Sequence, residues 1–271
     1  MKNRKIFLFL SFILLLSVVL MGCSSAEDTS IDNDQSTTEE ASGGTLVLGR
    51  GGDSVDLDPA IVTDGESFRV TKNIFETLIE FDTDSTELVP GLAKEWEVSP
   101  DGLTYTFKLQ EGVKFHDGTD FNAEAVVYNF ERWNGGDKEK FYYYNSQFGD
   151  VITSVQAVDE YTFEIKTARP VAPLFKNIAM SPFAIASPAA IEKYGDKVNE
   201  NPVGTGPFTF SEWKRTDTIT IVKNENYWKE GLPKLDSVIF KVIPDNSARL
   251  KEKKTGEVDV IEGVNYVDLP S

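Results

Sequence analysis

The side chains that most often perform catalysis are scarce in this sequence. It contains one histidine, His116, and one cysteine, Cys23. No second histidine or thiol is present to activate a nucleophile, and the Gly-x-Ser-x-Gly pattern of hydrolases does not occur. Carboxylate pairs are plentiful, but an acidic chain produces them by composition alone, so they do not indicate glycoside hydrolysis. This inventory argues against an enzyme, including a secreted hydrolase.

Two further patterns could bind a metal ion or a phosphate group, and both are weak. His116 lies near Asp117 and Asp120, but three such residues in one turn do not complete a metal coordination shell. Gly51-Gly52-Asp53 would let a ligand approach the backbone closely, yet neither GxGxxG nor GK[ST] accompanies it. We therefore predict no metal ion, no nucleotide and no other cofactor.

Two other segments have the composition of a ligand-binding surface. Thr63-Asp64-Gly65-Glu66 has the spacing of a capping box, and the amides at such a helix start can hold the negative end of a ligand. Phe141 to Tyr144 are consecutive aromatic residues within the polar stretch 137–147, which we predict to be a loop. Tyrosine combines a flat apolar face with a hydroxyl group, as ligand pockets require. The alternatives are a cap that only begins a helix and aromatic rings that only cover the core.

Length and charge limit the remaining possibilities. The 271 residues, of which 40% are apolar and 11% aromatic, can fill the core of one large domain or of two ordinary ones. The formal net charge is −17. Phosphate backbones repel such a surface, so we expect no nucleic-acid partner.

The beginning of the chain reads as a leader followed by a tether. Three basic residues precede the apolar run 6–20, and Leu20-Met21-Gly22-Cys23 follows. This ending resembles a bacterial lipobox, in which the cysteine is lipidated and the leader is cut before it. A lone cysteine cannot form an internal disulfide. We predict a lipoprotein signal peptide at 1–22, a lipidated (palmitate-type) Cys23 and a disordered tether at 23–42; the alternative is an uncleaved anchor, for which the run is short.

The rest of the sequence alternates short strands and helices. The alternation of Tyr105, Phe107 and Leu109 predicts a strand, and turn signals at 100–102 and 111–112 predict a hairpin whose second strand is 113–115. Helices are expected after Thr63, with inward residues up to 79, and after the cap Asn122. We also expect strands at 45–49, 151–158, 161–167, 208–213, 218–223, 238–243 and 258–261, and helices at 187–195 and 245–255.

A series of short motifs occurs in order along this part of the chain. They are Leu57-Asp-Pro59, Asn73-Ile-Phe-Glu-Thr-Leu78, Leu92-Ala-Lys-Glu-Trp96, Asp101-Gly-Leu-Thr-Tyr-Thr-Phe107, Gly112-Val-Lys-Phe-His-Asp-Gly118, Pro202-Val-Gly-Thr-Gly-Pro-Phe208, Asn226-Tyr-Trp228 and Gly256-Glu-Val-Asp259. Together they resemble the family 5 solute-binding proteins of ABC importers, the dipeptide-, oligopeptide- and nickel-binding group. The resemblance runs from about residue 43 to the last residue.

The resemblance implies the fold class. We expect an α/β, periplasmic-binding-protein-like fold (type II, cluster C), with lobe I formed by 43–84 and 202–271 and an inserted α+β subdomain formed by 85–201. Family members run to roughly twice this length, so the second lobe is expected to be missing. Since the family traps its ligand between two lobes by hinge closure, we expect this chain alone to bind its substrate poorly.

The resemblance also implies a function. The chain is expected to be a monomeric, lipid-anchored receptor on the extracellular face of the cell membrane. It would capture di- or oligopeptides and deliver them to the permease and ATPase subunits of an ABC importer. The substrate-binding residues that the resemblance implies are Val62, Thr63, Asp64, Ser67, Tyr144, Asn145, Ser181 and Phe183.

Two alternatives to peptide transport stay open. Nickel-binding relatives carry an arginine in the stretch that corresponds to 177–186, and this chain has none there, which favours peptide over nickel; haem uptake is a further possibility within the same fold. A sensor lipoprotein that binds peptide pheromones and signals without transport would show the same motifs. Adjacent permease and ATPase genes would favour the transport receptor.

Overall fold

The computed structural model of the protein describes residues 43–264. The predicted signal peptide, the tether and Cys23 lie outside the described residues, as does the stretch 265–271. Within the described part, no helix is long and apolar enough to span a membrane.

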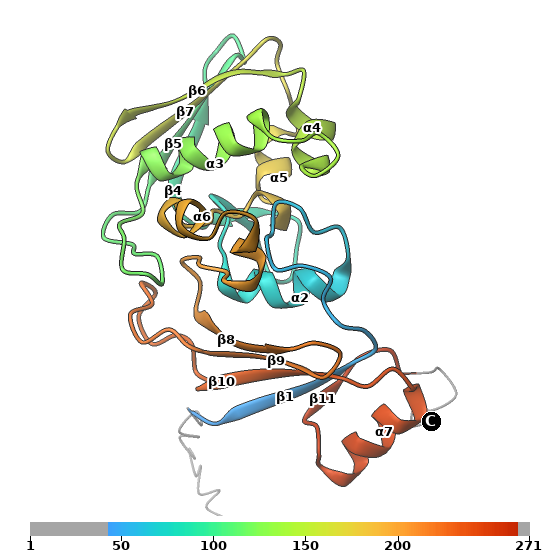
Figure 1. The fold of residues 1–271 in the computed structure, drawn as a ribbon. Helices are drawn as coiled ribbons and strands as arrows, with labels where there is room; N and C mark the ends of the chain where they lie inside the picture. Colours follow the sequence, from blue (N-terminus) through green and yellow to red (C-terminus); the bar gives the residue numbers. More distant parts are fainter. Residues whose placement is uncertain (1–42, 265–271) are drawn as a thin grey trace, which may run out of the picture. The chain divides into compact units, whose positions relative to one another are not determined.

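The first sheet draws its strands from both ends of the described chain (Figure 1). Its strands are β1 (Thr45–Arg50), β8 (Phe208–Lys214), β9 (Thr218–Lys223), β10 (Ser237–Val242) and β11 (Val260–Ile261), in the order β11-β1-β10-β9-β8. β1 is parallel to both of its neighbours, and β8, β9 and β10 pair antiparallel. These strands confirm the predicted ones to within a residue or two.

Two helices accompany this sheet. Helix α2 (Gly65–Ile74) contributes Val70 and Ile74 to a buried cluster that also contains Phe208, Ile219 and Phe240 of the sheet. Helix α7 (Asn246–Thr255) lies against β1 and β11 and ends at Gly256, which adopts a left-handed conformation with φ of 79°. The helix predicted at 245–255 is therefore confirmed, and its end follows from the glycine that comes after it.

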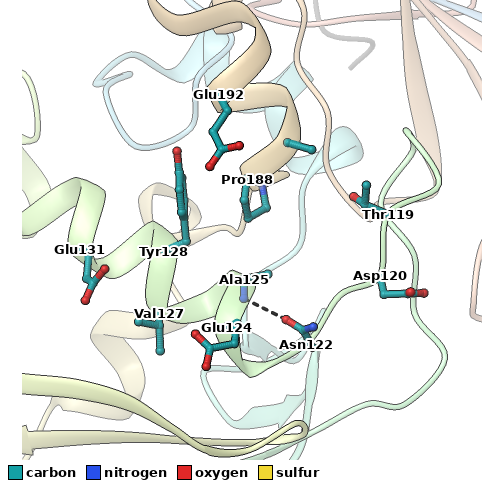
Figure 2. Close-up of a pocket in the computed structure, with 11 residues that line it drawn as sticks. Thr119, Asp120, Asn122, Glu124, Ala125, Val127, Tyr128, Glu131, Pro188 and Glu192 are labelled. Atoms are coloured by element: carbon teal, nitrogen blue, oxygen red, sulfur yellow. Dashed lines mark hydrogen bonds between the residues drawn. The ribbon is translucent and has the colours of Figure 1, made fainter.

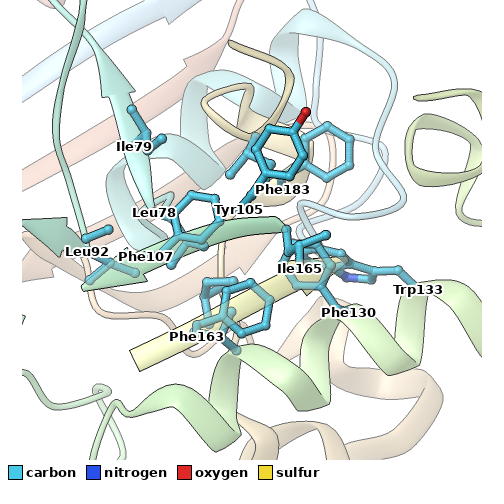
Figure 3. Close-up of a cluster of buried hydrophobic side chains, with 14 of the residues drawn as sticks. Leu78, Ile79, Leu92, Tyr105, Phe107, Phe130, Trp133, Phe163, Ile165 and Phe183 are labelled. Atoms are coloured by element: carbon cyan, nitrogen blue, oxygen red, sulfur yellow. The ribbon is translucent and has the colours of Figure 1, made fainter. Parts of the chain in front are cut away.

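The second sheet is antiparallel throughout. It contains β4 (Ala93–Val98), β5 (Thr104–Leu109), β6 (Ile152–Asp159) and β7 (Thr162–Thr167), in the order β4-β5-β7-β6. Helix α3 (Ala123–Gly135) packs on it. Phe130 and Trp133 of α3 share a buried cluster with Phe107 and Phe163 of the strands (Figure 3), and the ring centroids of Phe130 and Phe163 are 5.1 Å apart.

The partner predicted for β5 is wrong. Residues 113–115 form no strand and contribute only an isolated bridge between Lys114 and Asp120. Because β4 and β7 occupy the two edges of β5, no edge remains for a third strand. Val113 and Phe115 are nevertheless buried, with 1% and 3% of their surface exposed. The sequence pattern therefore predicted the burial of Val113 and Phe115 correctly, but it predicted the wrong partner for β5.

The remaining elements are short and connect the sheets. They are the ribbon of β2 (Ile79–Phe81) and β3 (Leu88–Pro90), the helices α4 (Tyr142–Phe148), α5 (Leu174–Ile178) and α6 (Pro188–Tyr194), and the 3-10 turns η1 (Ser181–Phe183) and η2 (Gly195–Glu200). Asn122 caps α3 by accepting the Ala125 amide, as predicted.

Three local predictions are wrong. The N-cap of α2 is Asp64, whose carboxylate accepts the Ser67 amide at 2.8 Å, and it is not Thr63. This helix ends at Ile74 rather than at 79, because the chain becomes extended at Phe75. Residues 142–148 form helix α4 within the stretch that was predicted to be a loop.

The segment 202–207 crosses directly beneath the end of α2. The Gly206 amide donates to the Ile74 carbonyl at 2.9 Å, and a Cβ atom on Gly204 would lie 2.2 Å from the same carbonyl oxygen. The Thr205 hydroxyl donates to the Glu76 carboxylate at 2.9 Å. Only glycine allows the two backbones to approach this closely.

We predict that Gly204→Ala destabilises the protein by about 1–3 kcal/mol or more, because the new methyl group overlaps backbone that cannot easily move. The measurement is the free energy of unfolding in urea. Gly135→Ala is the matched control, since a Cβ atom there meets nothing within 4 Å. Equal stability of the two variants would show that the crossing tolerates a side chain.

The only histidine of the chain fixes the same crossing segment. His116 Nε2 lies 2.9 Å from the Gly206 carbonyl oxygen, and the Gly204 amide approaches His116 Nδ1 at 3.4 Å. A carbonyl can only accept, so Nε2 carries the proton and Nδ1 accepts. Burial lowers the pKa of His116, although the Gly206 carbonyl and Asp117 act in the opposite direction. A second proton would place an N–H against the Gly204 amide.

We therefore predict that His116 makes the protein less stable in acid. Its folded pKa lies below the unfolded value of about 6.5, so the unfolded chain binds the proton first. The contribution is complete above about pH 6.5 and is lost as the pH falls from there towards the folded pKa. Urea unfolding between pH 5 and 8, compared with His116→Asn, measures this difference. An NMR titration that placed the single imidazole at or above about 6.5 would contradict the prediction.

Candidate ligand-binding site

The loop between β1 and α2, together with the first turn of α2, carries four of the predicted binding residues. Thr63 is exposed and Asp64 is half-buried, whereas Val62 and Ser67 have 2% and 0% of their surface exposed. The Ser67 hydroxyl accepts the backbone amides of Val55 at 2.9 Å and of Asp56 at 3.4 Å. Of the four, Thr63 and Asp64 can therefore meet a ligand, and the other two shape the loop that presents them.

A buried ion pair anchors this loop to α3. Asp58 accepts from both terminal nitrogens of Arg132, and the two side chains are 2% and 15% exposed. The backbone carbonyl of Asp58 also accepts the Ile61 amide at 3.1 Å and the Val62 amide at 3.3 Å. The Arg132 guanidinium lies 5.2 Å from the ring centroid of Phe141. One arginine thus contacts both the loop before α2 and the residue that precedes α4.

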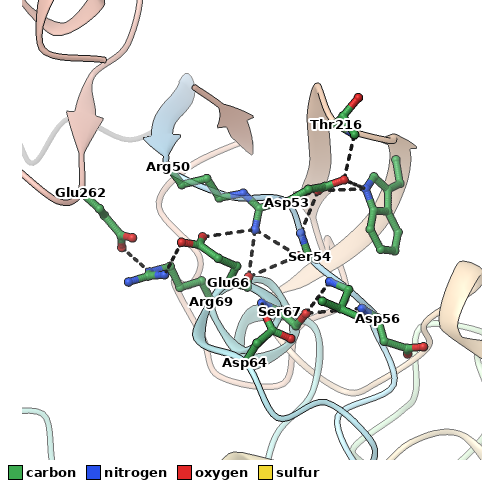
Figure 4. A network of polar contacts seen from close by, with 12 residues as sticks. Arg50, Asp53, Ser54, Asp56, Asp64, Glu66, Ser67, Arg69, Thr216 and Glu262 are labelled. Carbon is green, nitrogen blue, oxygen red and sulfur yellow. Dashed lines mark hydrogen bonds and ion pairs between the residues drawn. The ribbon is translucent and has the colours of Figure 1, made fainter. Parts of the chain in front are cut away.

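A chain of alternating charges surrounds the first turn of α2 (Figure 4). Arg50 is fully buried, and it donates to Asp53 at 3.1 Å and to the Glu66 carbonyl at 2.9 Å. Glu66 pairs with Arg69 at 3.1 Å, and Arg69 also pairs with Glu262 beyond β11. Burial lowers the pKa of Arg50, which the carboxylates of Asp53 and Glu66 partly offset.

This environment changes what the helix start can bind. The Ser67 amide is already satisfied by Asp64, and Glu66 adds a second carboxylate to the same turn. A negative ligand group would meet the Asp64 carboxylate here, whereas the Glu66 carboxylate is already paired with Arg69. The Asp64 carboxylate can pair with a ligand ammonium group, and the expectation that the amides of this turn hold a negative end stays a prediction.

The aromatic helix α4 presents tyrosines other than the one expected. Tyr144 is only 3% exposed and packs against Phe130 and Trp133 in the core, and burial raises its pKa to about 12. Tyr142 is 56% exposed, and the half-buried Tyr143 stacks edge-on against Phe68 of α2 with ring centroids 6.3 Å apart. The helical turn of this segment thus directs Tyr142 and Tyr143 outward and Tyr144 inward.

The other predicted residues are not all available to one ligand. Asn145 is half-buried, and its side-chain amide donates to the Phe141 carbonyl at 3.0 Å. Phe183 is 1% exposed and packs against Phe148 with ring centroids 5.1 Å apart, so it belongs to the core. Ser181 is half-buried and lines a cavity beside the second half of α2. The candidate ligand surface is therefore formed by Thr63, Asp64, Phe68, Tyr142 and Tyr143.

A further groove, with a volume of about 440 Å³, lies between α3 and α6 (Figure 2). Four carboxylates line it, from Asp120, Glu124, Glu131 and Glu192, and no basic side chain does. None of the predicted binding residues is among its lining residues. Such a surface repels anions, and it stands apart from the candidate ligand surface.

Comparison with known proteins decides the family. The model described as Bacterial extracellular solute-binding proteins, family 5 Middle matches residues 87–271, which is more than half of the chain. The chain belongs to this family.

Relatives of this family 5 protein bind different solutes. The glutathione-binding protein GsiB of Pectobacterium atrosepticum is 40% identical over 211 residues, which cover 78% of this chain and 40% of that protein. The solved structure of DppA from Helicobacter pylori in complex with the peptide STSA has a TM-score of 0.79 and 36% identity, covering 84% of this chain and 48% of that one. NikZ from Campylobacter jejuni in complex with Ni(L-His) has a TM-score of 0.71 and 27% identity, covering 79% and 42%.

These comparisons confirm the expected fold class. The neighbours are periplasmic binding proteins of type II, and the described part of the chain corresponds to one lobe of that fold. The chain spans about 40% of the length of the curated relatives that it matches.

We predict that the Asp58–Arg132 pair of this family 5 protein is essential to its stability. Arg132→Met leaves a carboxylate buried without its partner, and we expect a loss of about 3–5 kcal/mol. Asp58→Asn combined with Arg132→Met should cost less than the sum of the two single changes. Urea unfolding measures each value.

Lys94→Met is the matched control for this pair. It breaks the ion pair with Glu111, in which the two side chains are 43% and 65% exposed, so we expect a loss of no more than about 1 kcal/mol. Similar losses in the free energy of unfolding for Lys94→Met and Arg132→Met would contradict the prediction that the buried pair is essential to stability.

Proposed function

We propose that this chain forms one side of the ligand cleft in an extracytoplasmic receptor of an ABC importer that captures di- or oligopeptides. In this proposal, residues 43–84 and 202–271 belong to lobe I, and 85–201 form the inserted subdomain. The receptor hands its peptide to a membrane permease coupled to an ATPase. It has no catalytic residues and acts by binding alone.

The observation that carries the proposal is the candidate ligand surface itself. Asp64 supplies negative charge at the first turn of α2, and Tyr142, Tyr143 and Phe68 supply aromatic faces beside it. A peptide offers the complement of both, since it combines an ammonium terminus with a polar backbone and apolar side chains. No part of this surface requires a particular side chain on the ligand.

The similar proteins support a peptide more than another solute. GsiB is named a glutathione-binding protein, and DppA was solved with the peptide STSA. A dipeptide-binding protein of Pseudoalteromonas, solved with Met-Leu, has a TM-score of 0.77 and 25% identity. Nickel is the second candidate because NikZ, which carries Ni(L-His), is also similar.

The proposal includes the attachment to the membrane. A lipid on Cys23 and the tether at 23–42 would hold a monomeric receptor at the outer face of the cell membrane, close to its permease. Radiolabelled palmitate incorporation into the chain, and its loss in Cys23→Ala, tests this part separately from ligand binding.

We predict that the tetrapeptide Ser-Thr-Ser-Ala and glutathione shift the backbone NMR signals of residues 62–68 and 142–145 in the full 271-residue chain. Tyr142→Ala should weaken peptide binding at least about tenfold, because it removes an exposed aromatic contact. Tyr194→Ala is the control, since Tyr194 ends α6 and lies outside the candidate ligand surface.

Each other outcome selects against the peptide proposal. If Ni(L-His) shifts these signals and both peptides do not, the nickel alternative is correct. If all three leave them unchanged, residues 62–68 and 142–145 do not bind these ligands within this chain alone. A sensor that signals without transport would bind the peptides but leave their uptake into cells unchanged when its gene is deleted.

A further inference from the structure

A separate cavity with a volume of about 510 Å³ lies beside the second half of α2, away from the first turn that faces the candidate ligand surface. Its walls come from α2, the strand β2, the turn η1 and the segment 227–229. The polar residues that line it include Thr71, Lys72, Glu76, Glu80, Ser181 and Lys229. None of the residues of the candidate ligand surface is among its lining residues.

One wall of the cavity is held together by the hydrogen bonds of a buried carboxylate, that of Glu76. Glu76 is 6% exposed, and its carboxylate accepts from Tyr227 Oη at 2.7 Å, Trp228 Nε1 at 2.8 Å and Thr205 Oγ1 at 2.9 Å. Lys229 Nζ adds an ion pair at 3.4 Å. A carboxylate with this many donors is fully occupied, so it fixes the wall and has no capacity left for a ligand.

The carboxylate of Glu80, by contrast, accepts fewer hydrogen bonds than that of Glu76. Its only hydrogen-bond partner within residues 43–264 is Lys229 Nζ, at 3.3 and 3.5 Å from its two oxygens. Charge-assisted bonds are normally about 2.7–2.9 Å long, and the same ammonium group is shared with Glu76. Burial raises the pKa of Glu80, and the attraction of Lys229 only partly opposes this. The Glu80 carboxylate can therefore accept a further hydrogen bond from a donor group on a ligand in the cavity.

The Thr71 hydroxyl has no partner at all in the described part of the chain. The residue is 1% exposed, and its Oγ1 atom makes no hydrogen bond. Helical threonines usually return such a hydroxyl to the carbonyl four residues earlier. Leaving a buried hydroxyl unpaired is unfavourable. Because Thr71 lines the cavity, a ligand placed there can supply the missing bond.

The charges of the lining define the ligand. Two carboxylates, Glu76 and Glu80, face two ammonium groups, Lys72 and Lys229, and Lys72 is exposed. A purely cationic or purely anionic ligand would meet one repelling pair, whereas a molecule with both charges meets an opposite charge at each end. The remaining lining residues are largely apolar and include Pro59, Phe75, Phe81, Ala179, Ala184 and Pro207.

We propose that this cavity is a second binding site, for a free α-amino acid with an apolar side chain. Its ammonium group pairs with Glu80 and donates to the Thr71 hydroxyl, and its carboxylate pairs with Lys72. Its side chain lies against the apolar wall at Phe75 and Phe81. The site is independent of the peptide surface, and it does not rest on the proposed function.

The test is calorimetric titration of the full 271-residue chain with L-leucine. We expect saturable binding, and at least tenfold weaker binding or none of 4-methylpentanoate, which lacks the ammonium group, and of 3-methylbutylamine, which lacks the carboxylate. Glu80→Gln and Lys72→Gln should each weaken leucine binding at least tenfold. Glu95→Gln on β4 and Lys254→Gln on α7, both exposed, are the matched controls and should leave it unchanged.

Thr71→Val separates a binding role from a structural one. Since valine has the same shape and removes an unpaired hydroxyl, the ligand-free variant should be as stable as the parent or more stable, while its affinity for leucine falls. No saturable binding of leucine, equal binding of all three compounds, or unchanged affinity in Glu80→Gln and Thr71→Val would each overturn the proposal. Loss of leucine binding in Tyr142→Ala but not in the cavity variants would place the amino acid at the peptide surface instead and would also overturn it.

Discussion

A single buried carboxylate, that of Glu76, joins segments that are far apart in the sequence. It lies just after α2 and accepts hydrogen bonds from Thr205 in the crossing segment and from Tyr227 and Trp228 beyond β9. A charge at this depth is stable only when its lone pairs are satisfied. The crossing, the end of α2 and the 227–229 segment must therefore form together. The close glycine contacts of 204 and 206 with Ile74 reinforce the same junction.

This junction explains how one ligand surface can be formed from distant elements. The end of α2 is fixed by Glu76, and its beginning is fixed by the Arg50 network and by the anchored loop at Asp58. Arg132, which holds Asp58, also contacts Phe141 at the start of α4. The two elements that carry Phe68 and Tyr143 are thus positioned by shared partners, and the surface needs no ligand to assemble it.

Much of the secondary structure could be predicted because it depends on residues that are close together in the sequence. The cap at Asn122, the stop at Gly256 and the inward alternation of β5 depend only on neighbouring residues. The partners of β5 could not be predicted from the same pattern, because β7 lies more than fifty residues further along the chain. Val113 and Phe115 are buried like strand residues without being in a strand, and a sequence pattern records burial rather than pairing.

The site was predicted less well than the fold, for a related reason. The sequence singled out the segments 62–67 and 141–147, but it did not indicate which of their side chains face outward. The aromatic stretch has no side-chain cap at its start and few strong helix formers, so we predicted a loop. A loop has no regular periodicity from which buried and exposed side chains can be assigned. Once it is a helix, Tyr144 and Phe148 point inward together, since residues four apart share a face. The arginine that anchors the site, Arg132, carries no local signal, because its partner Asp58 lies 74 residues earlier.

The distribution of charge over the described chain then separates three surfaces with different preferences. The groove between α3 and α6 is lined by carboxylates alone, so it excludes anions and has no basic group to orient a ligand. The start of α2 combines the Asp64 carboxylate with neighbouring aromatic rings, which suits an ammonium terminus attached to a longer, partly apolar molecule. The cavity beside the second half of α2 has both signs of charge among its lining residues, which suits a short molecule with both charges. Since the ends of a peptide are separated by its length and those of an amino acid are not, the spacing of the charges distinguishes the two ligands at the two ends of the same helix.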